Sequence, residues 1–377
     1  MVDRLQFAMR NYFRFCDAFA VCFLFVGGEA MEKEYYGGID VIKFFCALAV
    51  VVIHTEPFAD ICGILNSVTV NSVCRVAVPF FFMSSGFLLF GNSEARSPLS
   101  PPVKKYVKRI LFMYLMWSAV YFPFTVLEMS FSGGADKALG IFLGYIKNMI
   151  FSAGYGFLWY LPATAVAVLL MSFFLSKKVN TARITALASV LYFIGLLGQD
   201  LFVLIRPLSE YEGFWTVLSK FYGVIGTTRN GVFEGFLFVA AGTLLARRKK
   251  KHEAKKSFVL FCLSLLLLTA ESALASLFDT RLEYDMYIML VPCAYFLFET
   301  ALGIGVKCPK LCRLFRSYSS AIYFTHMLVL EFIRIAEPVK LGKMTVFALT
   351  LVGTFAVSTV MIKLAETKHG KFLKKII

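Results

Sequence analysis

The chain has 377 residues, of which 59% are hydrophobic, and its mean hydropathy is +0.72. This composition excludes an ordinary soluble globular domain. The formal net charge of +15 would suit a nucleic-acid-binding protein, but the basic residues gather between apolar runs, as they do in the cytoplasmic loops of membrane proteins. We therefore expect membrane lipids, and no nucleic acid, beside these charges.

The apolar runs predict an all-α polytopic membrane protein. A helix needs roughly 17 to 25 apolar residues to cross the hydrocarbon core. Ten such spans are predicted near 39–55, 72–90, 110–128, 158–175, 183–205, 231–246, 257–278, 286–304, 318–335 and 344–364. A shorter run at 138–152 predicts a re-entrant or interfacial helix. Ahead of this transmembrane domain over 35–377, residues 1–34 are expected to be an N-terminal extension, either an interfacial helix or the result of a start placed too far upstream.

Most Lys and Arg fall in the loops that share one side with the amino terminus, and Arg247 to Lys251 form the plainest run. Since positively charged loops stay in the cytoplasm, we expect a multi-pass protein of a bacterial plasma membrane with both termini cytoplasmic. The nine Cys are scattered through or beside apolar runs, so no metal site is expected.

Three titratable side chains interrupt the first predicted span. At about 100° per residue, Asp40, Lys43 and His54 share one face of an otherwise apolar helix, with His54 roughly 16 Å beyond Lys43. Ionisable groups at this depth usually face a bundle interior or a wet cavity. An Asp40–Lys43 salt bridge beside an incidental histidine explains the same pattern more simply.

The second span carries Arg75 one turn before Pro79. A guanidinium at membrane depth needs an acidic partner or a polar ligand. The small residues that follow allow close helix approach or hydrogen bonding, and they are Ser84, Ser85 and Gly86. A basic cluster at the mouth of the third span suits either phosphate binding or topology anchoring, and consists of Lys105, Lys108 and Arg109.

Further polar and aromatic positions follow in later spans. Trp159 opens the fourth span, where interfacial aromatic residues are enriched whatever the function. Arg229 and Glu234 flank the start of the sixth, where they could bind a polar ligand or simply pair with each other. His326 lies inside the ninth span with Tyr323 one turn earlier, and a single buried histidine is often a hydrogen-bonded packing element.

In this order the motifs resemble the membrane-bound acyltransferase family 3. Asp40, Lys43 and His54 are similar to the family's first helix, although Lys43 stands where Arg is usual. The other similar stretches are Pro79 to Phe87, Leu158 to Leu161 and Ser317 to His326. The resemblance covers roughly residues 36–335 and rests on the order of motifs that are individually weak.

The resemblance implies an O-acyltransferase that moves an acyl group, most simply acetyl, from cytoplasmic acyl-CoA to a hydroxyl of an extracytoplasmic or lipid-linked glycan, such as a cell-surface polysaccharide. No bound cofactor is expected, because acyl-CoA is a co-substrate. The implied catalytic residues are His54, Asp40 and Arg75. The implied donor-binding residues are Lys43, Lys105, Lys108 and Arg109, and those for the acceptor are Trp159, Arg229, Glu234, Tyr323 and His326.

Two mechanisms suit a buried imidazole at position 54. His54 acts as general base toward the acceptor hydroxyl, or it first forms an acyl-imidazole. A carboxylate would orient the ring, with candidates at Glu56, Glu271 and Glu299. The oxyanion would be met by Arg75 or by donors near Ser84 and Ser85.

A transporter or flippase of a polar or lipid-linked substrate is the main alternative. The sequence shows no internal repeat and predicts no pair of interrupted helices at matching places, which argues modestly against transport. The stretches Ile39 to Phe58 and Val73 to Phe90 are also similar to the membrane halves of vancomycin-type serine racemases, where such a domain would serve amino-acid delivery. We expect no soluble racemase domain within these residues.

Overall fold

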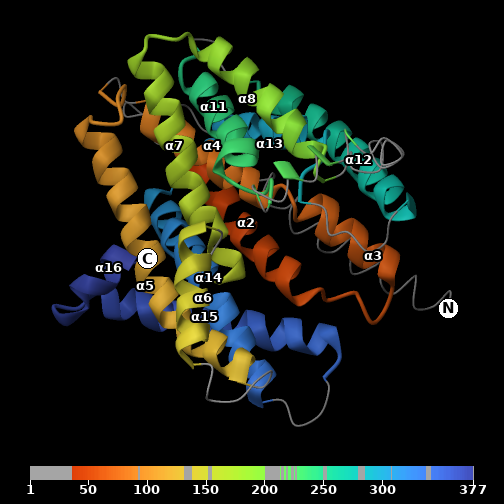
Figure 1. Ribbon diagram of the computed structural model, residues 1–377, viewed down its shortest axis with the longest axis vertical. Coiled ribbons are helices and arrows are strands. Elements are labelled where there is room, and N and C mark those ends of the chain that lie inside the picture. Colours follow the sequence, from red (N-terminus) through yellow and green to blue (C-terminus); the bar gives the residue numbers. More distant parts are fainter. Residues whose placement is uncertain are drawn as a thin grey trace.

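The computed structural model of the chain is a bundle of α-helices (Figure 1). It describes residues 36–91, 94–130, 138–151, 155–199, 227–248, 253–278, 285–306, 308–336 and 341–376, together with 213, 216, 217, 220, 221 and 225. The elements are α2 (Gly37–Thr55), α3 (Gly63–Val68), η2 (Thr69–Val73), α4 (Ala77–Phe90), α5 (Pro101–Ser130), α6 (Ala138–Phe151), η4 (Gly156–Trp159), α7 (Tyr160–Ser176), α8 (Thr181–Leu196), η6 (Gly231–Gly235), α11 (Phe236–Ala246), α12 (Ala254–Phe278), α13 (Leu290–Gly303), α14 (Pro309–Ala336), α15 (Lys343–Glu366), η7 (His369–Phe372) and α16 (Leu373–Ile376).

The prediction of an all-α polytopic membrane protein is confirmed. Seven helices are long and apolar enough to cross a membrane, and three shorter apolar helices accompany them in the described part of the chain. Each of the ten predicted spans coincides with one of these helices. Their backbone N–H and C=O groups are bonded within each helix, as the hydrocarbon core requires, and their long runs of Leu, Val, Ile and Phe suit contact with it.

The short helix predicted over 138–152 is α6, and it lies antiparallel along α5. The Tyr145 hydroxyl donates to the Ser118 carbonyl at 2.6 Å, and the Tyr114 hydroxyl donates to the Met149 carbonyl at 2.7 Å. These two bonds place α6 beside the inner part of α5. The predicted alternatives for this helix, re-entrant or interfacial, stay predictions.

Several predicted boundaries differ from the structure or lie outside the described residues. The helical region of the second span begins at Gly63 instead of near residue 72, because α3 and η2 precede α4. The segment predicted as the fifth span ends as α8 at Leu196, and 200–205 lie outside the described residues. Residues 1–34 also lie outside them, so their predicted role as an extension remains a prediction.

Two helices, α2 and α4, form the centre of the bundle. α2 packs on α14 and α4, and α4 packs on α11. In the apolar 18-residue window of Gly63–Phe90, 78% of the residues are buried, whereas 17% are buried in that of Lys343–Glu366. α15 and α12 are therefore peripheral helices whose apolar side chains face outward, and such a surface suits contact with lipid.

The close contact of α4 with α11 depends on glycine. A Cβ at Gly86 would stand 2.1 Å from the Val239 carbonyl oxygen, and one at Gly242 would stand 2.1 Å from the Met83 carbonyl oxygen. The expected close approach at Ser84, Ser85 and Gly86 is thus found. Both serine hydroxyls donate to carbonyls of their own helix, so neither is a spare oxyanion donor.

Two π-helical segments lie ahead of the helices in this contact. Thr69–Val73 precedes α4, and Gly231–Gly235 leads directly into α11. A π segment leaves no simple mark in apolar periodicity, and neither segment was predicted from the sequence. Single π turns occur frequently at functional sites.

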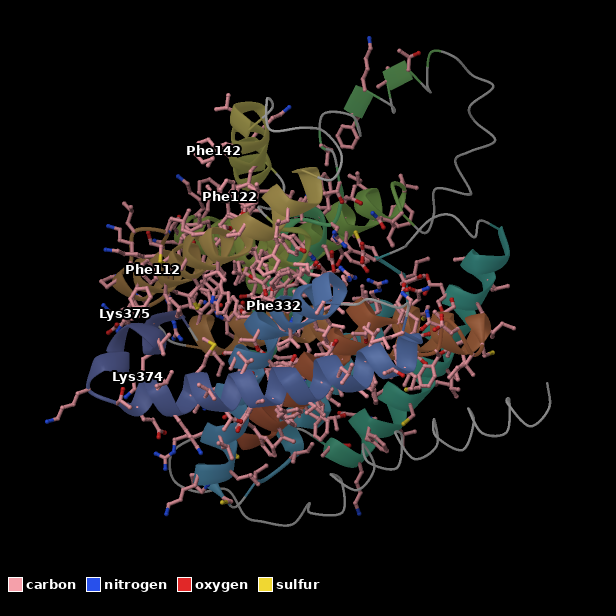
Figure 2. All side chains as sticks on the ribbon, turned by 90° about the horizontal axis from the view of Figure 1, so that it is seen from below. Phe112, Phe122, Phe142, Phe332, Lys374 and Lys375 are labelled. Carbon is pink, nitrogen blue, oxygen red and sulfur yellow. The ribbon has the colours of Figure 1, made fainter. Side chains whose placement is uncertain are left out.

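Two apolar clusters divide the interior. The larger one joins α2, α4, α7, α8, α11, α12 and α13, and the smaller one joins α5, η4, α7 and α14 around Tyr121, Phe157 and Phe324. Figure 2 shows Phe112, Phe122 and Phe142 along one flank of the bundle, and Lys374 and Lys375 near Phe112. Phe112 contacts Phe372, and the indole N–H of Trp117 donates to the Ile376 carbonyl at 2.9 Å. The C-terminal turn is held against α5 in this way.

Candidate active site

The bundle has two polar ends, named here by their side chains. The basic end holds Lys105, Lys108, Arg109 and Arg247, and the histidine end holds His54, His326, Arg229 and Asp285. α2 connects them, because Asp40 lies in its first turn and His54 in its last. Fourteen residues of helix separate the two side chains by about 21 Å.

His54 and His326 form a pair at the seam between the two apolar clusters. Their ring centroids lie 5.3 Å apart, and Phe157 packs edge-on against both rings. α2 ends directly after His54, since Glu56 adopts left-handed φ and ψ values of 48° and 57° and Pro57 follows. The sequence prediction placed both histidines in polar roles but did not predict their contact.

The hydrogen bonds of His326 determine which ring nitrogen is available. Nδ1 lies 3.0 Å from the Ile322 carbonyl oxygen. A carbonyl can only accept, so Nδ1 carries the proton and the neutral ring presents a lone pair at Nε2. His326 is fully buried, and Nε2 has no hydrogen-bond partner among the described residues. A buried polar atom left in this state needs an explanation, for which a bound ligand, a water molecule or a catalytic role are the choices.

A cavity of about 420 Å³ reaches His54. Three elements form its wall: the end of α2, the last turns of α14 and the start of α15. The lining residues are His54, Thr55, Asp60, Leu330, Arg334, Leu341, Gly342, Lys343 and Val346. This volume is in the range of small-molecule sites. His54, at the wall, is the histidine that a substrate in the cavity would meet.

An arginine–carboxylate cluster lies beside the histidines. Asp285 accepts hydrogen bonds from Arg75 and from Arg229, the latter at 2.9 Å, and Arg75 also donates to Asn71. Arg75 and Arg229 are close enough to His54 to act on its ring electrostatically. The acidic partner that Arg75 needs is therefore Asp285, which the sequence analysis did not select.

Glu234 adds a carboxylate that the arginines do not saturate. It lies in the π segment Gly231–Gly235, is 2% exposed, and its Oε2 has no hydrogen-bond partner among the described residues. Asn230 begins this segment by accepting the backbone N–H groups of Val232 and Phe233. The predicted Arg229–Glu234 pair is replaced by Arg229–Asp285, although Arg75, Arg229 and Asp285 all interact electrostatically with Glu234.

Trp159 and Tyr323 help to build this end of the bundle. The Arg229 guanidinium carbon lies 5.1 Å from the centroid of the Trp159 ring, a cation–π contact. Trp159 is therefore part of the polar cluster, and its predicted role in binding the acceptor stays a prediction. The Tyr323 hydroxyl donates to the Phe157 carbonyl at 2.9 Å, so Tyr323 positions Phe157 beside the histidines.

The structure does not bring Asp40 to the histidines. Arg316 of α14 donates to both carboxylate oxygens of Asp40, at 2.9 and 2.7 Å. Lys43 interacts electrostatically with Asp40, and its carbonyl accepts from Ser319 at 3.0 Å. Asp40 lies too far along α2 to contact a group that reacts at His54. It instead forms an ion pair that joins α2 to α14.

The basic residues predicted to hold the donor lie at the other end of the bundle. Lys105, Lys108 and Arg109 are exposed on the first turns of α5, and Lys43 is half-buried on α2. The Tyr106 hydroxyl between them donates to Ser85 at 2.8 Å. These residues share one end of the bundle, as a donor site requires, but they do not surround a common cavity that the structure defines.

The three carboxylates considered as partners of the His54 ring have other roles. Glu56 pairs with Lys343 at 3.4 Å. Glu271 accepts the backbone N–H groups of Ile288 and Met289 at the start of α13. Glu299 pairs with Arg248 at the basic end. Within the described residues no group of three or more His, Cys, Asp and Glu side chains could hold a metal ion.

The chain is similar to proteins of known family. The model of the acyltransferase 3 domain matches residues 36–363. An amino-acid racemase of Enterococcus faecalis is 30% identical over 339 residues, 88% of this chain and 47% of the relative. A serine/alanine racemase of Enterococcus gallinarum is 30% identical over 267 residues, 70% of this chain and 37% of the relative. The chain thus spans less than half the length of these relatives. No solved structure matches it.

Proposed function

The chain belongs to the acyltransferase 3 family, and from that premise we propose that it transfers an acyl group, most simply acetyl, from cytoplasmic acyl-CoA to a hydroxyl of an extracytoplasmic or lipid-linked glycan. The observation that carries the proposal is the histidine pair: His54 lines the 420 Å³ cavity, and His326, in ring contact behind it, keeps a buried Nε2 without a partner among the described residues. An acyl transfer to a hydroxyl needs a group that accepts the hydroxyl proton, and an imidazole is well suited to it.

His54 is the residue proposed to contact the acceptor. It takes the proton of the acceptor hydroxyl while the hydroxyl oxygen bonds to the thioester carbon. The carbon–sulfur bond then breaks, and the thiolate leaves with the proton as free coenzyme A. In the alternative, the His54 imidazole nitrogen bonds to the thioester carbon and coenzyme A leaves as the carbon–sulfur bond breaks. The acceptor hydroxyl then attacks the acyl-imidazole, gives up its proton and frees the imidazole as the carbon–nitrogen bond breaks. His326 packs against the His54 ring and is proposed to assist it in proton transfer. Its Nε2 can accept a proton, and its Nδ1 is held by the Ile322 carbonyl.

The arginine–carboxylate cluster is proposed to hold the acceptor. Glu234 offers an unpartnered acceptor oxygen for a hydroxyl, and Trp159 offers a flat ring of the kind on which sugars lie. Arg75 would meet the oxyanion by electrostatic interaction. The donor would enter from the basic end, where Lys43, Lys105, Lys108 and Arg109 attract its phosphates.

A second candidate function is the transport or flipping of a polar substrate. Two observations favour it: the π segments before α4 and α11, and a cluster with both charge signs, which suits a zwitterion. The relatives named amino-acid racemase and serine/alanine racemase make an amino acid the first substrate to test.

Labelled acetyl-CoA added to membranes that contain the protein separates these functions. We expect label in the glycan or lipid-linked fraction, reduced about 10²- to 10⁴-fold in His54→Ala. His369→Ala, a histidine change in the C-terminal segment, is the matched control and should keep the activity. Transfer that persists in His54→Ala would remove the catalytic role of that residue. Amino-acid uptake that survives His54→Ala, without acyl transfer, would establish the second candidate instead.

A further inference from the structure

A second cavity, of about 560 Å³, opens at the basic end. It lies between the turn from α7 to α8, the end of α11 and the middle of α13. Its lining consists of Val179, Asn180, Thr181, Leu244, Leu245, Arg247, Arg248 and Tyr295. None of the donor residues predicted from the sequence lines this cavity.

Arg248 and Glu299 form a closed network on one side of the cavity. Arg248 donates to Glu299 at 2.6 Å, and the Ser257 hydroxyl donates to the other carboxylate oxygen at 3.0 Å. The charge of Arg248 is therefore balanced by protein. This side of the cavity has no charge left for a ligand.

Arg247, on the other side, is not balanced. Its described hydrogen bond goes to the Thr181 hydroxyl at 3.0 Å, and no carboxylate lies within ion-pair distance of it among the described residues. Partial burial and the nearby Arg96 guanidinium lower the pKa of Arg247. Arg247 lines the cavity and Arg96 repels it electrostatically, so an anion bound in the cavity would stabilise the Arg247 charge.

The remaining donors fit an oxyanion with several oxygens. Asn180 caps α8 by accepting the Ala182 N–H at 2.8 Å, which leaves its amide NH₂ as a donor. The hydroxyls of Thr181 and Tyr295 line the same wall. The helix α8 is sixteen residues long, and its first turn adds the positive end of a helix dipole.

We propose that this cavity binds a phosphate group of an anionic ligand, with Arg247 as the charged contact. Guanidinium groups bind phosphate by paired, charge-assisted hydrogen bonds. Two sources offer that chemistry at a cytoplasmic membrane surface: the headgroup of an anionic phospholipid, and a soluble phosphorylated molecule such as coenzyme A. Basic residues that only set topology need no cavity, so the cavity distinguishes this site from a loop anchor.

Binding to full-length protein in phosphatidylcholine nanodiscs tests the proposal, with coenzyme A as the soluble probe and added phosphatidylglycerol as the lipid probe. We expect Arg247→Gln to weaken one of the two about tenfold or more. Gln can still donate to Thr181, so the fold should survive. Arg183→Gln, an exposed arginine of α8 outside the cavity lining, is the matched control and should change binding less than twofold.

The two probes distinguish the two possible ligands. Loss of coenzyme A binding identifies a soluble phosphate ligand, and loss of phosphatidylglycerol binding identifies a lipid headgroup. If Arg247→Gln and Arg96→Gln bind both probes as the wild type does, or if the wild type binds neither, the proposal is overturned. No acyl transfer is measured, so this result and the test of the transferase function fail independently.

Discussion

The two ends of the bundle satisfy buried carboxylates differently. At the basic end, Arg316 bonds both oxygens of Asp40, and Arg248 and Ser257 each bond one oxygen of Glu299. At the histidine end, Glu234 keeps one oxygen without a partner among the described residues. Because an unpartnered buried polar group costs about 1–3 kcal/mol, the histidine end retains a cost that a purely structural region would remove.

The comparison separates two roles on one helix. Asp40, Lys43 and His54 form a single polar stripe in the sequence, yet Asp40 holds α2 to α14 and His54 reaches a cavity. Of the carboxylates compared above, Asp40 and Glu299 have both oxygens bonded, whereas Glu234, beside the histidines, has one oxygen without a partner among the described residues.

The largest effect that tests this comparison is expected for His326→Asn. Asn can keep a donor near the Nδ1 position, toward the Ile322 carbonyl, but has no basic nitrogen at Nε2. We expect kcat for acyl transfer to fall about 100-fold, the lower end of general acid–base contributions. Steady-state kinetics on protein of confirmed melting temperature would measure it.

Thr325→Val provides the control on the same helix. Thr325 is also buried, and its hydroxyl contacts the Ala321 carbonyl and Ser358, so its loss should affect stability and leave kcat within twofold. If His326→Asn retains wild-type kcat, the free Nε2 has no part in the reaction and His326 is a packing residue.

Much of the fold follows from the sequence because membrane helices obey a length rule. The ten apolar runs match helices since each must satisfy its own backbone. The errors lie at helix ends: α3 extends the second span upstream, and α8 ends before the predicted fifth span does. Neither end carries a strong apolar boundary, so hydropathy alone misplaces both.

The site was predictable only in part, since sequence gives spacing along one helix but not contacts between helices. The motifs located His54, His326 and Arg75, and the membrane depth of Arg75 required an acid. Nothing in the sequence identified that acid as Asp285, 210 residues away, or identified Arg316 as the partner of Asp40. A systematic match of buried cations to the few acids near helix ends would have reduced the choices.

Asp285→Asn should have an intermediate effect. The amide has the size of the carboxylate but no charge, so Arg75 and Arg229 lose their shared counter-ion. We expect kcat/KM for the acceptor to fall about tenfold, since the freed guanidinium groups no longer hold one geometry beside His54. Initial rates at varied acceptor concentration would measure it.

Glu271→Gln is the matched control. Glu271 accepts the backbone N–H groups of Ile288 and Met289, which lie a few residues after Asp285 at the start of α13. It should lower the melting temperature without changing the KM for the acceptor. An equal fall in kcat/KM for both variants would show that Asp285 only stabilises the helix ends. The arginine–carboxylate cluster would then be structural, as the ion pairs of the basic end are.

The smallest effect concerns Asp40→Asn, which tests the structural role assigned to the basic end. The Asp40 side chain is 5% exposed, whereas that of Arg316 is 57% exposed, so water screens the pair from one side. The free energy of unfolding should fall by about 1 kcal/mol, the upper end of the range for exposed ion pairs. Denaturant titration in detergent micelles would measure it.

Asp40→Asn and Arg316→Gln combined should cost less than the sum of the two single changes, because both break the same contact. Strictly additive costs would mean that the pair does not stabilise α2 against α14, and the buried carboxylate would then need a functional explanation at the basic end as well.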